Sequence, residues 1–285
     1  MESSSSRATR PTPSPDTSSP SPTARSEPLA AADIIVVGGG CYGTFYSRQL
    51  ERARARGALT YERVLVVDRD PACQLTRDLS PASNRELVAQ EWDGFFDEYL
   101  ASRSSPRRTP GSSSTAPLPG SPAAPPSYIV PSPLMPHLMF DWLRRSAMKR
   151  WPERSATQDP LTEPVGTPYD TLAPDGTRYV SWADWLCPTH CIEPHTCPVI
   201  RAPRTWEMSD TATAVVERLS KSRKVFGPAL FVTRHLTDGV GAFPVSDAVA
   251  AAELLRLAGE SGRPSSLLVG TVSACHGALG LLVLG

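Results

Sequence analysis

Short apolar runs bounded by glycine or aspartate mark the first patterned part of the chain. Residues 33–37 are a β-branched run that ends in three glycines, which predicts a buried parallel strand. Apolar side chains then recur at roughly helical spacing over residues 41–56, and Gly57 ends that pattern. A second apolar run, at residues 63–67, predicts another strand and is closed by Asp68. This order of elements predicts one βαβ unit.

The later part of the chain continues to alternate helical and strand-like patterns. Helical spacing predicts helices at residues 85–99, 136–150 and 246–257, with a short helix from about residue 209. Apolar runs predict strands at residues 229–233 and 267–272, with residues 281–284 as a further candidate. Residues 152–180 are expected to be mostly loop. The predicted fold class is therefore α/β, a doubly wound and mostly parallel Rossmann-like sheet with a disordered N-terminal tail and an internal Ser/Pro-rich insertion.

Composition sets the expected domain organisation. Residues 1–31 and 103–127 are rich in Ser and Pro and cannot bury enough apolar area to offset the entropy of ordering the chain. We therefore expect a disordered tail and a low-complexity linker at these two places. Residues 32–102 would form the N-terminal half of the Rossmann-like domain. Residues 128–285 would form the remainder, including a Cys-rich loop at residues 182–206.

Charge and hydropathy restrict the classes of partner. The 29 basic and 29 acidic residues cancel, so no strong field favours nucleic acid or an anionic membrane. We expect no secretory signal and no membrane span, because no apolar run has the required position or length. A cytosolic location follows, in which the six cysteines stay reduced unless a metal holds them. The expected partner is a small-molecule substrate or nucleotide, and the oligomeric state is left open.

A glycine fingerprint stands between the first strand and the first helix. The pattern G-x-G-x-x-G is matched by Gly38, Gly39, Gly40, Cys41, Tyr42 and Gly43. In this pattern Gly38 permits the tight turn, Gly40 lets the backbone approach a pyrophosphate, and Gly43 lets the helix pack against the sheet. The N–H groups at the helix start would face the phosphates.

This segment resembles the N-terminal βαβ unit of NAD(P)- and FAD-dependent oxidoreductases over roughly 40 residues. The resemblance implies a dinucleotide cofactor, NAD(P) or FAD, with Asp68 accepting hydrogen bonds from a ribose. Asp68 favours NAD or the adenosine half of FAD, whereas the neighbouring Arg69 would suit the 2′-phosphate of NADP. The alternatives are a Rossmann-like unit that has lost its ligand and one that holds S-adenosylmethionine.

A cluster of cysteines is the most unusual stretch of the sequence. Cys187, Cys191 and Cys197 follow the spacing C-x3-C-x5-C, which matches neither a zinc ribbon nor a bacterial ferredoxin. Thiolates at this density predict a metal site for zinc or an iron–sulfur cluster. The fourth ligand is open among four residues, of which His190 is the first choice and His195, Cys275 and His276 are the others. The alternative is a proline-braced loop whose thiols pack beside tryptophans.

Two histidines and one aspartate follow predicted strands by a few residues. His235 and Asp238 follow the strand at 229–233, and His276 follows the strand at 267–272. If these strands are parallel to the first one, all three side chains share an edge with the glycine loop. We therefore predict His276, His235 and Asp238 as the catalytic group, with histidine as the general acid or base.

The functional hypothesis is an NAD(P)- or FAD-binding oxidoreductase-like protein with a metal-binding Cys/His loop. The alternative is a non-catalytic nucleotide-sensing or interaction module in which the Cys loop is structural.

Overall fold

The computed structural model describes residues 28–104, 124–188, 191–262 and 264–285. Strands and helices alternate regularly in the first part of the chain, in the order β1 (Leu29–Val37), α1 (Cys41–Ala55), β2 (Leu59–Asp68), α2 (Gln74–Asp78), β3 (Arg85–Ala89), α3 (Trp92–Ser104) and β4 (Tyr128–Val130). The second part begins with α4 and three short strands, in the order α4 (Leu138–Arg150), β5 (Ala156–Asp159), β6 (Tyr169–Leu172) and β7 (Arg178–Ser181).

The remaining elements run to the C-terminus. They are β8 (Thr196–Cys197), β9 (Ala202–Pro203), α5 (Met208–Leu219), β10 (Val225–Val232), β11 (Arg234–Thr237), β12 (Val240–Pro244), α6 (Val245–Glu260), β13 (Ser265–Val272) and β14 (His276–Leu284). In the described residues these strands form two six-stranded sheets and one small two-stranded ribbon made by β8 and β9.

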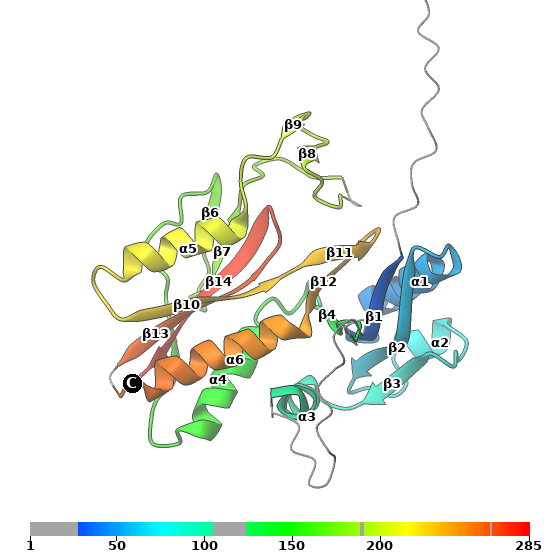
Figure 1. Cartoon of the computed structure of the whole chain (residues 1–285), viewed down its shortest axis with the longest axis horizontal. Helices are drawn as coiled ribbons and strands as arrows, with labels where there is room; N and C mark the ends of the chain where they lie inside the picture. The colour runs from blue at the N-terminus through cyan, green and yellow to red at the C-terminus, as the bar shows by residue number, and fades with distance from the viewer. Residues whose placement is uncertain (1–27, 105–123, 189–190, 263) are drawn as a thin grey trace, which may run out of the picture.

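The first sheet has the strand order β11-β12-β4-β1-β2-β3 (Figure 1). Its four strands β4, β1, β2 and β3 are parallel, because each pair along this row pairs in parallel register. The edge is completed from the other end of the chain, since β12 pairs antiparallel with β4 and β11 pairs antiparallel with β12. The predicted βαβ unit is thus present as β1, α1 and β2.

The second sheet is mainly antiparallel. Its order is β10-β13-β14-β7-β6, and β5 pairs with β14 beside this row. Only β10 and β13 pair in parallel, while β14 runs antiparallel to β13, β5 and β7.

The predicted doubly wound, mostly parallel sheet is therefore wrong: the strands form two mixed sheets. Two features of the second sheet explain the difference. Only residues 273–275 join β13 to β14, and a link this short makes a hairpin, whose strands are antiparallel. Residues 152–180 were expected to be loop but contribute β5, β6 and β7 to the same sheet.

Element boundaries differ from expectation at several places. The segment 85–99 is not one helix, because β3 occupies its start and α3 begins only at Trp92. The first strand begins at Leu29, inside the predicted tail, and Ser127 at the end of the predicted linker is buried. The domain boundaries as a whole stay a prediction, since residues 1–27 and 105–123 lie outside the described part of the chain.

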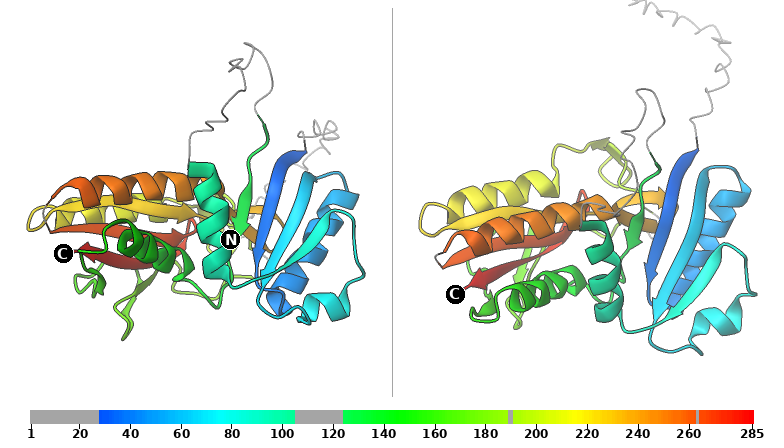
Figure 2. Two further views of the ribbon diagram at one scale, coloured as in Figure 1. Left: turned by 90° about the horizontal axis from the view of Figure 1, so that it is seen from below. Right: turned by 60° about the horizontal axis from the view of Figure 1, so that its bottom comes forward.

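Three helices join the two sheets into one core. Figure 2 shows α3 standing between the two sheets, with α4 and α6 lying along the second sheet. One hydrophobic cluster contains side chains from β1 and β2, from these three helices, and from β10, β13 and β14. The opposite face of the first sheet is covered by α1 and α2, and the opposite face of the second by α5.

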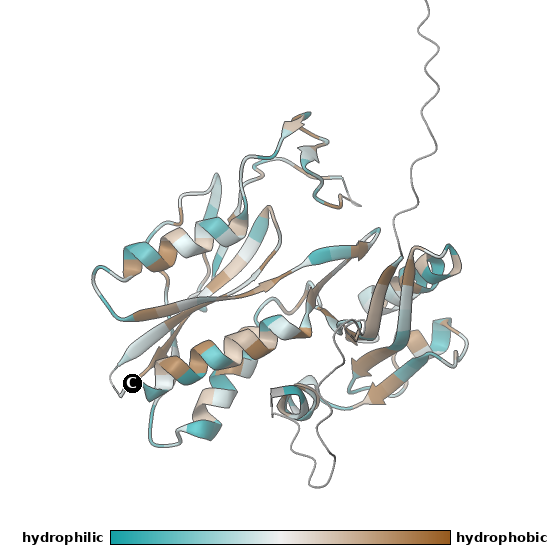
Figure 3. Ribbon diagram, in the orientation of Figure 1, coloured by the Kyte–Doolittle hydropathy of each residue, from teal (hydrophilic) through white to brown (hydrophobic). Residues whose placement is uncertain are grey.

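The chain crosses between the sheets along one extended path. β10 belongs to the second sheet and β11, two residues later, to the first, and Figure 1 shows them as a nearly continuous ribbon. Figure 3 shows apolar residues along β1 and β2, whose central residues are buried. A cavity lined by residues of both sheets lies near this crossing.

Candidate functional site

The main cavity has a volume of about 740 Å³ and lies where the two sheets approach each other. Tyr46 of α1 and the segment 131–133 after β4 line it from the first sheet. The second sheet and its loops contribute the ends of β7, β13 and β14 and part of the Cys-rich loop. His235 and His276 both line this cavity, so the structure brings together two of the three predicted catalytic residues.

His276 is held between two oxygen atoms. Its Nε2 atom lies 3.2 Å from Glu193 Oε1, and its Nδ1 atom lies 3.2 Å from Ser181 Oγ. The Ser181 hydroxyl also donates to the carbonyl of Ala183 at 2.9 Å. A hydroxyl has only one proton, so when Ser181 donates it to Ala183, the His276 Nδ1 atom must be the donor toward Ser181. The surroundings therefore accommodate His276 with protons on both ring nitrogens.

Glu193 is the acidic partner of the site, and only 11% of its side chain is exposed. Its carboxylate accepts hydrogen bonds from Ser273 Oγ at 2.7 Å and from the Ala274 N–H at 2.8 Å. Burial raises the pKa of Glu193, but the hydrogen bonds from His276 and Ser273 and the charge of His276 outweigh it and leave the pKa below its usual value. Glu193 has a φ of 51°, which is unusual for a non-glycine residue.

His235 and Asp238 separate in the structure. Burial lowers the pKa of His235, against the charges of Glu193 and Asp238, which raise it. The Asp238 carboxylate instead lies 3.9 Å from Arg56 on the surface and is 64% exposed. Asp238 is not among the residues that line the main cavity, although its charge still acts on His235. The hairpin of β11 and β12 directs it toward the C-terminal end of α1, whereas parallel strands were expected to bring it to the cavity.

The glycine loop has the local geometry that the fingerprint requires. Gly38 has a φ of +86° at the turn out of β1. A Cβ atom at Gly43 would stand 1.8 Å from the Gly38 carbonyl oxygen, so only glycine permits this packing. A Cβ atom at Gly40 would meet nothing within 4 Å, so that side of the loop is open. A Cβ atom at Gly39 would stand 2.4 Å from Cys73 Sγ. The Gly39 N–H donates a hydrogen bond to Asp68 Oδ2 at 2.6 Å.

The other predicted cofactor contacts surround this loop. The second carboxylate oxygen of Asp68 accepts the Asp70 N–H at 2.9 Å, so the acid is fixed beside the glycines. Arg69 is 70% exposed and lies 3.7 Å from Glu91. Cys41 and Tyr42 are both exposed at the first turn of α1.

Four cysteines line one small cavity of about 10 Å³ beside the main one. They are the three predicted ligands and Cys275, with Cys187 and Cys191 also lining the main cavity. Burial is the main cause that raises the pKa values of Cys187 and Cys275, and charge on neighbouring thiols adds to it. Within the described residues no group of three or more His, Cys, Asp or Glu side chains has the arrangement of a formed metal site. His190 lies outside the described residues, and His195 is exposed.

The Cys-rich loop is braced by Arg204 and by tryptophans. The Arg204 guanidinium donates to the carbonyls of Glu193 and Pro194 and pairs with Glu207. The rings of Trp182 and Trp206 stack with centroids 6.1 Å apart. The Trp206 indole N–H also donates to Cys275 Sγ at 3.4 Å, which connects the loop to the β13–β14 turn.

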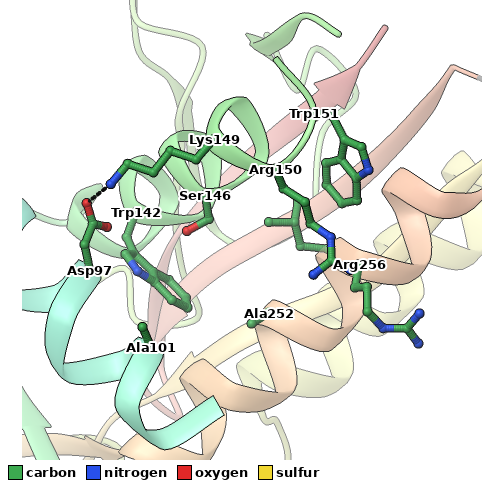
Figure 4. A pocket seen from close by; sticks show the side chains of 10 residues that line it. Asp97, Ala101, Trp142, Ser146, Lys149, Arg150, Trp151, Ala252 and Arg256 are labelled. Atoms are coloured by element: carbon green, nitrogen blue, oxygen red, sulfur yellow. Dashed lines mark hydrogen bonds and ion pairs between the residues drawn. The ribbon is translucent and has the colours of Figure 1, made fainter. Parts of the chain in front are cut away.

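A second cavity of about 380 Å³ lies between α3, α4 and α6 (Figure 4). Trp142 lines it, and the three cations around it each have an acidic partner. Lys149 pairs with Asp97 across the opening, Arg150 lies 3.1 Å from Glu260, and Arg256 pairs with Glu253 and Glu260. Because these charges are already neutralised, the cavity does not resemble an anion site.

Sequence reasoning missed Glu193, Ser181 and Ser273. Glu193 lies within the cysteine stretch, where only cysteine and histidine side chains were considered as functional residues. Its partner Ser273 is 80 residues away in sequence, and neither serine belongs to a recognisable motif. The hairpin between β13 and β14 brings Ser273 close to His276, and the pairing of β7 with β14 places Ser181 opposite His276; the pattern revealed neither.

Comparison with protein families gives one match. Residues 139–285 match the AF_1314_C family, described as an uncharacterized protein, C-terminal domain. The chain belongs to this family. No curated protein and no solved structure matches the chain.

The matched region begins one residue into α4 and reaches the last residue of the chain. It includes the second sheet, the Cys-rich loop, and β11 and β12, which complete the first sheet. His235, His276 and the four clustered cysteines therefore all lie in the family region, while the glycine loop lies before it. In the described part of the chain, no helix combines the length and the apolar character needed to cross a membrane.

Proposed function

We propose that this chain binds a dinucleotide, NAD(P) or FAD, at the loop of residues 38–43 and acts as an oxidoreductase on a small molecule in the main cavity. The observation that carries the proposal is the division of roles among the loop glycines. Gly38 makes the turn at positive φ, Gly43 allows contact between α1 and the loop backbone, and Gly40 leaves its outer side open. These are the three requirements of a pyrophosphate loop in a βαβ unit.

The start of α1 fits a phosphate group. Gly40 is the N-cap residue, no side chain caps the helix, and its first turn contains no acidic residue. The first N–H groups of a helix have no partner within the helix, and the helix dipole favours an anion beside them. The open space at Gly40, at the start of the helix, would let a phosphate come close to the backbone.

Asp68 supports a ribose next to the phosphates. Its carboxylate accepts two backbone N–H groups, which fix its orientation and leave further lone pairs for ribose hydroxyls. Arg69 is exposed and is paired only at 3.7 Å with Glu91, so it stays a candidate partner for a 2′-phosphate. Titration with NAD and with NADP distinguishes the two cofactors.

The position of the main cavity supports a reaction site. The carboxyl ends of β1 and β4 lie on the same edge of the first sheet, because the two strands are parallel neighbours. The glycine loop follows β1, and the cavity-lining segment 131–133 follows β4. A nicotinamide or flavin ring supplies hydride transfer when bound. The chain's own contribution at that end would be His276, held by Glu193 and Ser181, together with His235.

Two measurements on the purified full-length chain test this proposal. Its absorbance spectrum separates bound flavin from a colourless protein, and calorimetric titration with NAD, NADP and FAD measures binding. We expect one of the three to bind with about one site per chain. No binding by any of them would overturn the proposal.

A redox assay separates an enzyme from a binding module. The protein is mixed with the reduced form of the dinucleotide that binds and with an artificial electron acceptor, and oxidation of the dinucleotide is followed by absorbance. Oxidation above the protein-free rate supports an oxidoreductase. Binding without any such oxidation would favour a nucleotide-sensing module, which is the alternative function.

A further inference from the structure

We propose that Cys187, Cys191, Cys197 and Cys275 bind one zinc ion in a closed structural site. The observation is that these four side chains, three from one loop and one from the β13–β14 turn, line a single small cavity. Four of the six cysteines of the chain thereby surround one cavity, although Cys275 is 78 residues beyond Cys197 in sequence. This inference is independent of the proposed dinucleotide function.

N–H donors surround the sulfur atoms. The Glu193 N–H donates to Cys191 Sγ at 3.4 Å, and the Trp206 indole N–H donates to Cys275 Sγ at 3.4 Å. The buried indole nitrogen of Trp185 also lines the cavity and interacts with the Cys187 thiol. Donors directed at sulfur stabilise negative charge on it, which metal-bound thiolates carry and neutral thiols do not.

The size of the cavity favours a single ion. Its volume of about 10 Å³ is close to the space that one water-sized sphere needs, which suits a single zinc ion. The thiols surround this space without yet having the arrangement of a formed metal site. Binding of zinc would therefore have to draw the four sulfur atoms inward to the distance of about 2.3 Å that zinc–sulfur bonds require.

Four protein thiolates leave no open coordination position, which is the signature of a structural zinc site. Such an ion would tie the Cys-rich loop to the β13–β14 turn at Cys275. Glu193 sits in that loop and already bonds Ser273 and Ala274 of the same turn. The zinc ion would thus fix one wall of the main cavity without taking part in chemistry there.

Elemental analysis of the full-length chain, purified without chelator and supplied with zinc, tests the proposal. We expect about one zinc per chain, and the same for Cys41→Ser, a matched control at an exposed cysteine on another element. The variants Cys191→Ser and Cys275→Ser should lose most of the metal. Zinc below about 0.2 per chain in the wild type, or iron in place of zinc, would overturn the proposal.

Thiol titration of the wild-type chain gives a readout that does not depend on how the variants fold. In the native zinc-loaded protein the four clustered thiols should resist modification, as should the buried Cys73, and a chelator should make the four clustered thiols reactive while Cys73 stays protected. Mass spectrometry that maps the protected residues should find Cys275 among them. Protection of the four clustered thiols that a chelator does not relieve, a disulfide among them, or full zinc binding by Cys275→Ser would each contradict the four-thiolate site.

Discussion

At the scale of single residues, Asp33 shows how one buried carboxylate connects distant segments. It is 3% exposed and accepts hydrogen bonds from Arg63 at 3.0 Å, Tyr99 at 2.9 Å and Arg103 at 2.9 Å. These donors come from β2 and α3, so Asp33 links the middle of β1 to both. The two arginines are about half exposed, which limits the strength of each ion pair.

Asp33 predicts a pH dependence of stability. Burial raises its pKa, but the hydrogen bonds from Arg63 and Tyr99 and the charges of both arginines outweigh this and lower the pKa below its ordinary value. A lowered pKa means that the stabilisation is complete above the unfolded-state value of about 4 and is lost as the pH falls through the folded-state value. Asp33→Asn should therefore cost about 1–3 kcal/mol at neutral pH and less in acid.

Urea unfolding of wild type and Asp33→Asn, measured between about pH 7 and pH 3, checks this prediction. Asp184→Asn, at an exposed loop position, serves as the matched control and should follow the wild type. A constant difference between wild type and Asp33→Asn across this range would show that ionisation of Asp33 contributes nothing to stability.

At the scale of elements, Glu193 anchors the Cys-rich loop to the second sheet. Its carboxylate bonds Ser273 and Ala274 and lies 3.2 Å from His276. Glu193→Ala removes all three contacts and leaves the loop held by Arg204 and the tryptophans. Hydrogen bonds to a charged group contribute about 1.5–3 kcal/mol each, so the loop should open at least about tenfold more often.

Limited trypsin digestion followed by mass spectrometry measures that opening. Cleavage after the exposed Arg201 should be faster in Glu193→Ala than in the wild type, while Glu163→Ala, at an exposed loop position, should leave it unchanged. Equal cleavage after Arg201 in all three proteins would mean that Glu193 does not hold the loop.

The elements that could be predicted from the sequence are those with a long regular pattern. The helix expected at residues 41–56 is α1, and the strand expected at 267–272 forms most of β13. The prediction of a single helix at residues 85–99 was wrong because the few apolar positions of β3 continue into the aromatic pattern of α3. The last strand was predicted too short, since Gly277 and Gly280 interrupt its apolar pattern. A Cβ atom at either would stand within 3 Å of a neighbouring side chain.

At the scale of the whole molecule, the local pattern of apolar residues could not predict which distant strands pair with one another. Runs such as β13 and β14 are apolar on both faces, so their periodicity does not distinguish parallel from antiparallel neighbours. The candidate site shares this limit. His235 and His276 were found because histidine is a conspicuous candidate, while Glu193 required knowledge of the hairpin that brings it to His276.

The shared core predicts that both sheets unfold together. One cluster of buried residues contains side chains from β1 and β2 and from β10, β13 and β14, with α3, α4 and α6 between them. Opening either sheet would expose apolar area belonging to the other. Native-state hydrogen exchange should therefore give the same limiting free energy for the slowest amides of β2 and β13. Clearly different values for the two strands would indicate two separate folding units.

The central claim, dinucleotide binding at the glycine loop, is tested most directly by Gly40→Val. The loop is open at this position and the φ of Gly40 is −74°, so valine fits the free protein and should leave the unfolding midpoint nearly unchanged. It would, however, occupy the space proposed for the pyrophosphate. The matched control is Ala55→Val, an exposed position at the other end of the same helix.

Calorimetric titration of wild type, Gly40→Val and Ala55→Val with the dinucleotide that binds decides the question. A clash of about 1–3 kcal/mol in the complex predicts affinity about 10–100-fold weaker for Gly40→Val, with Ala55→Val equal to the wild type. Equal affinity in all three proteins would contradict the account, because the dinucleotide would then bind somewhere other than the loop of residues 38–43.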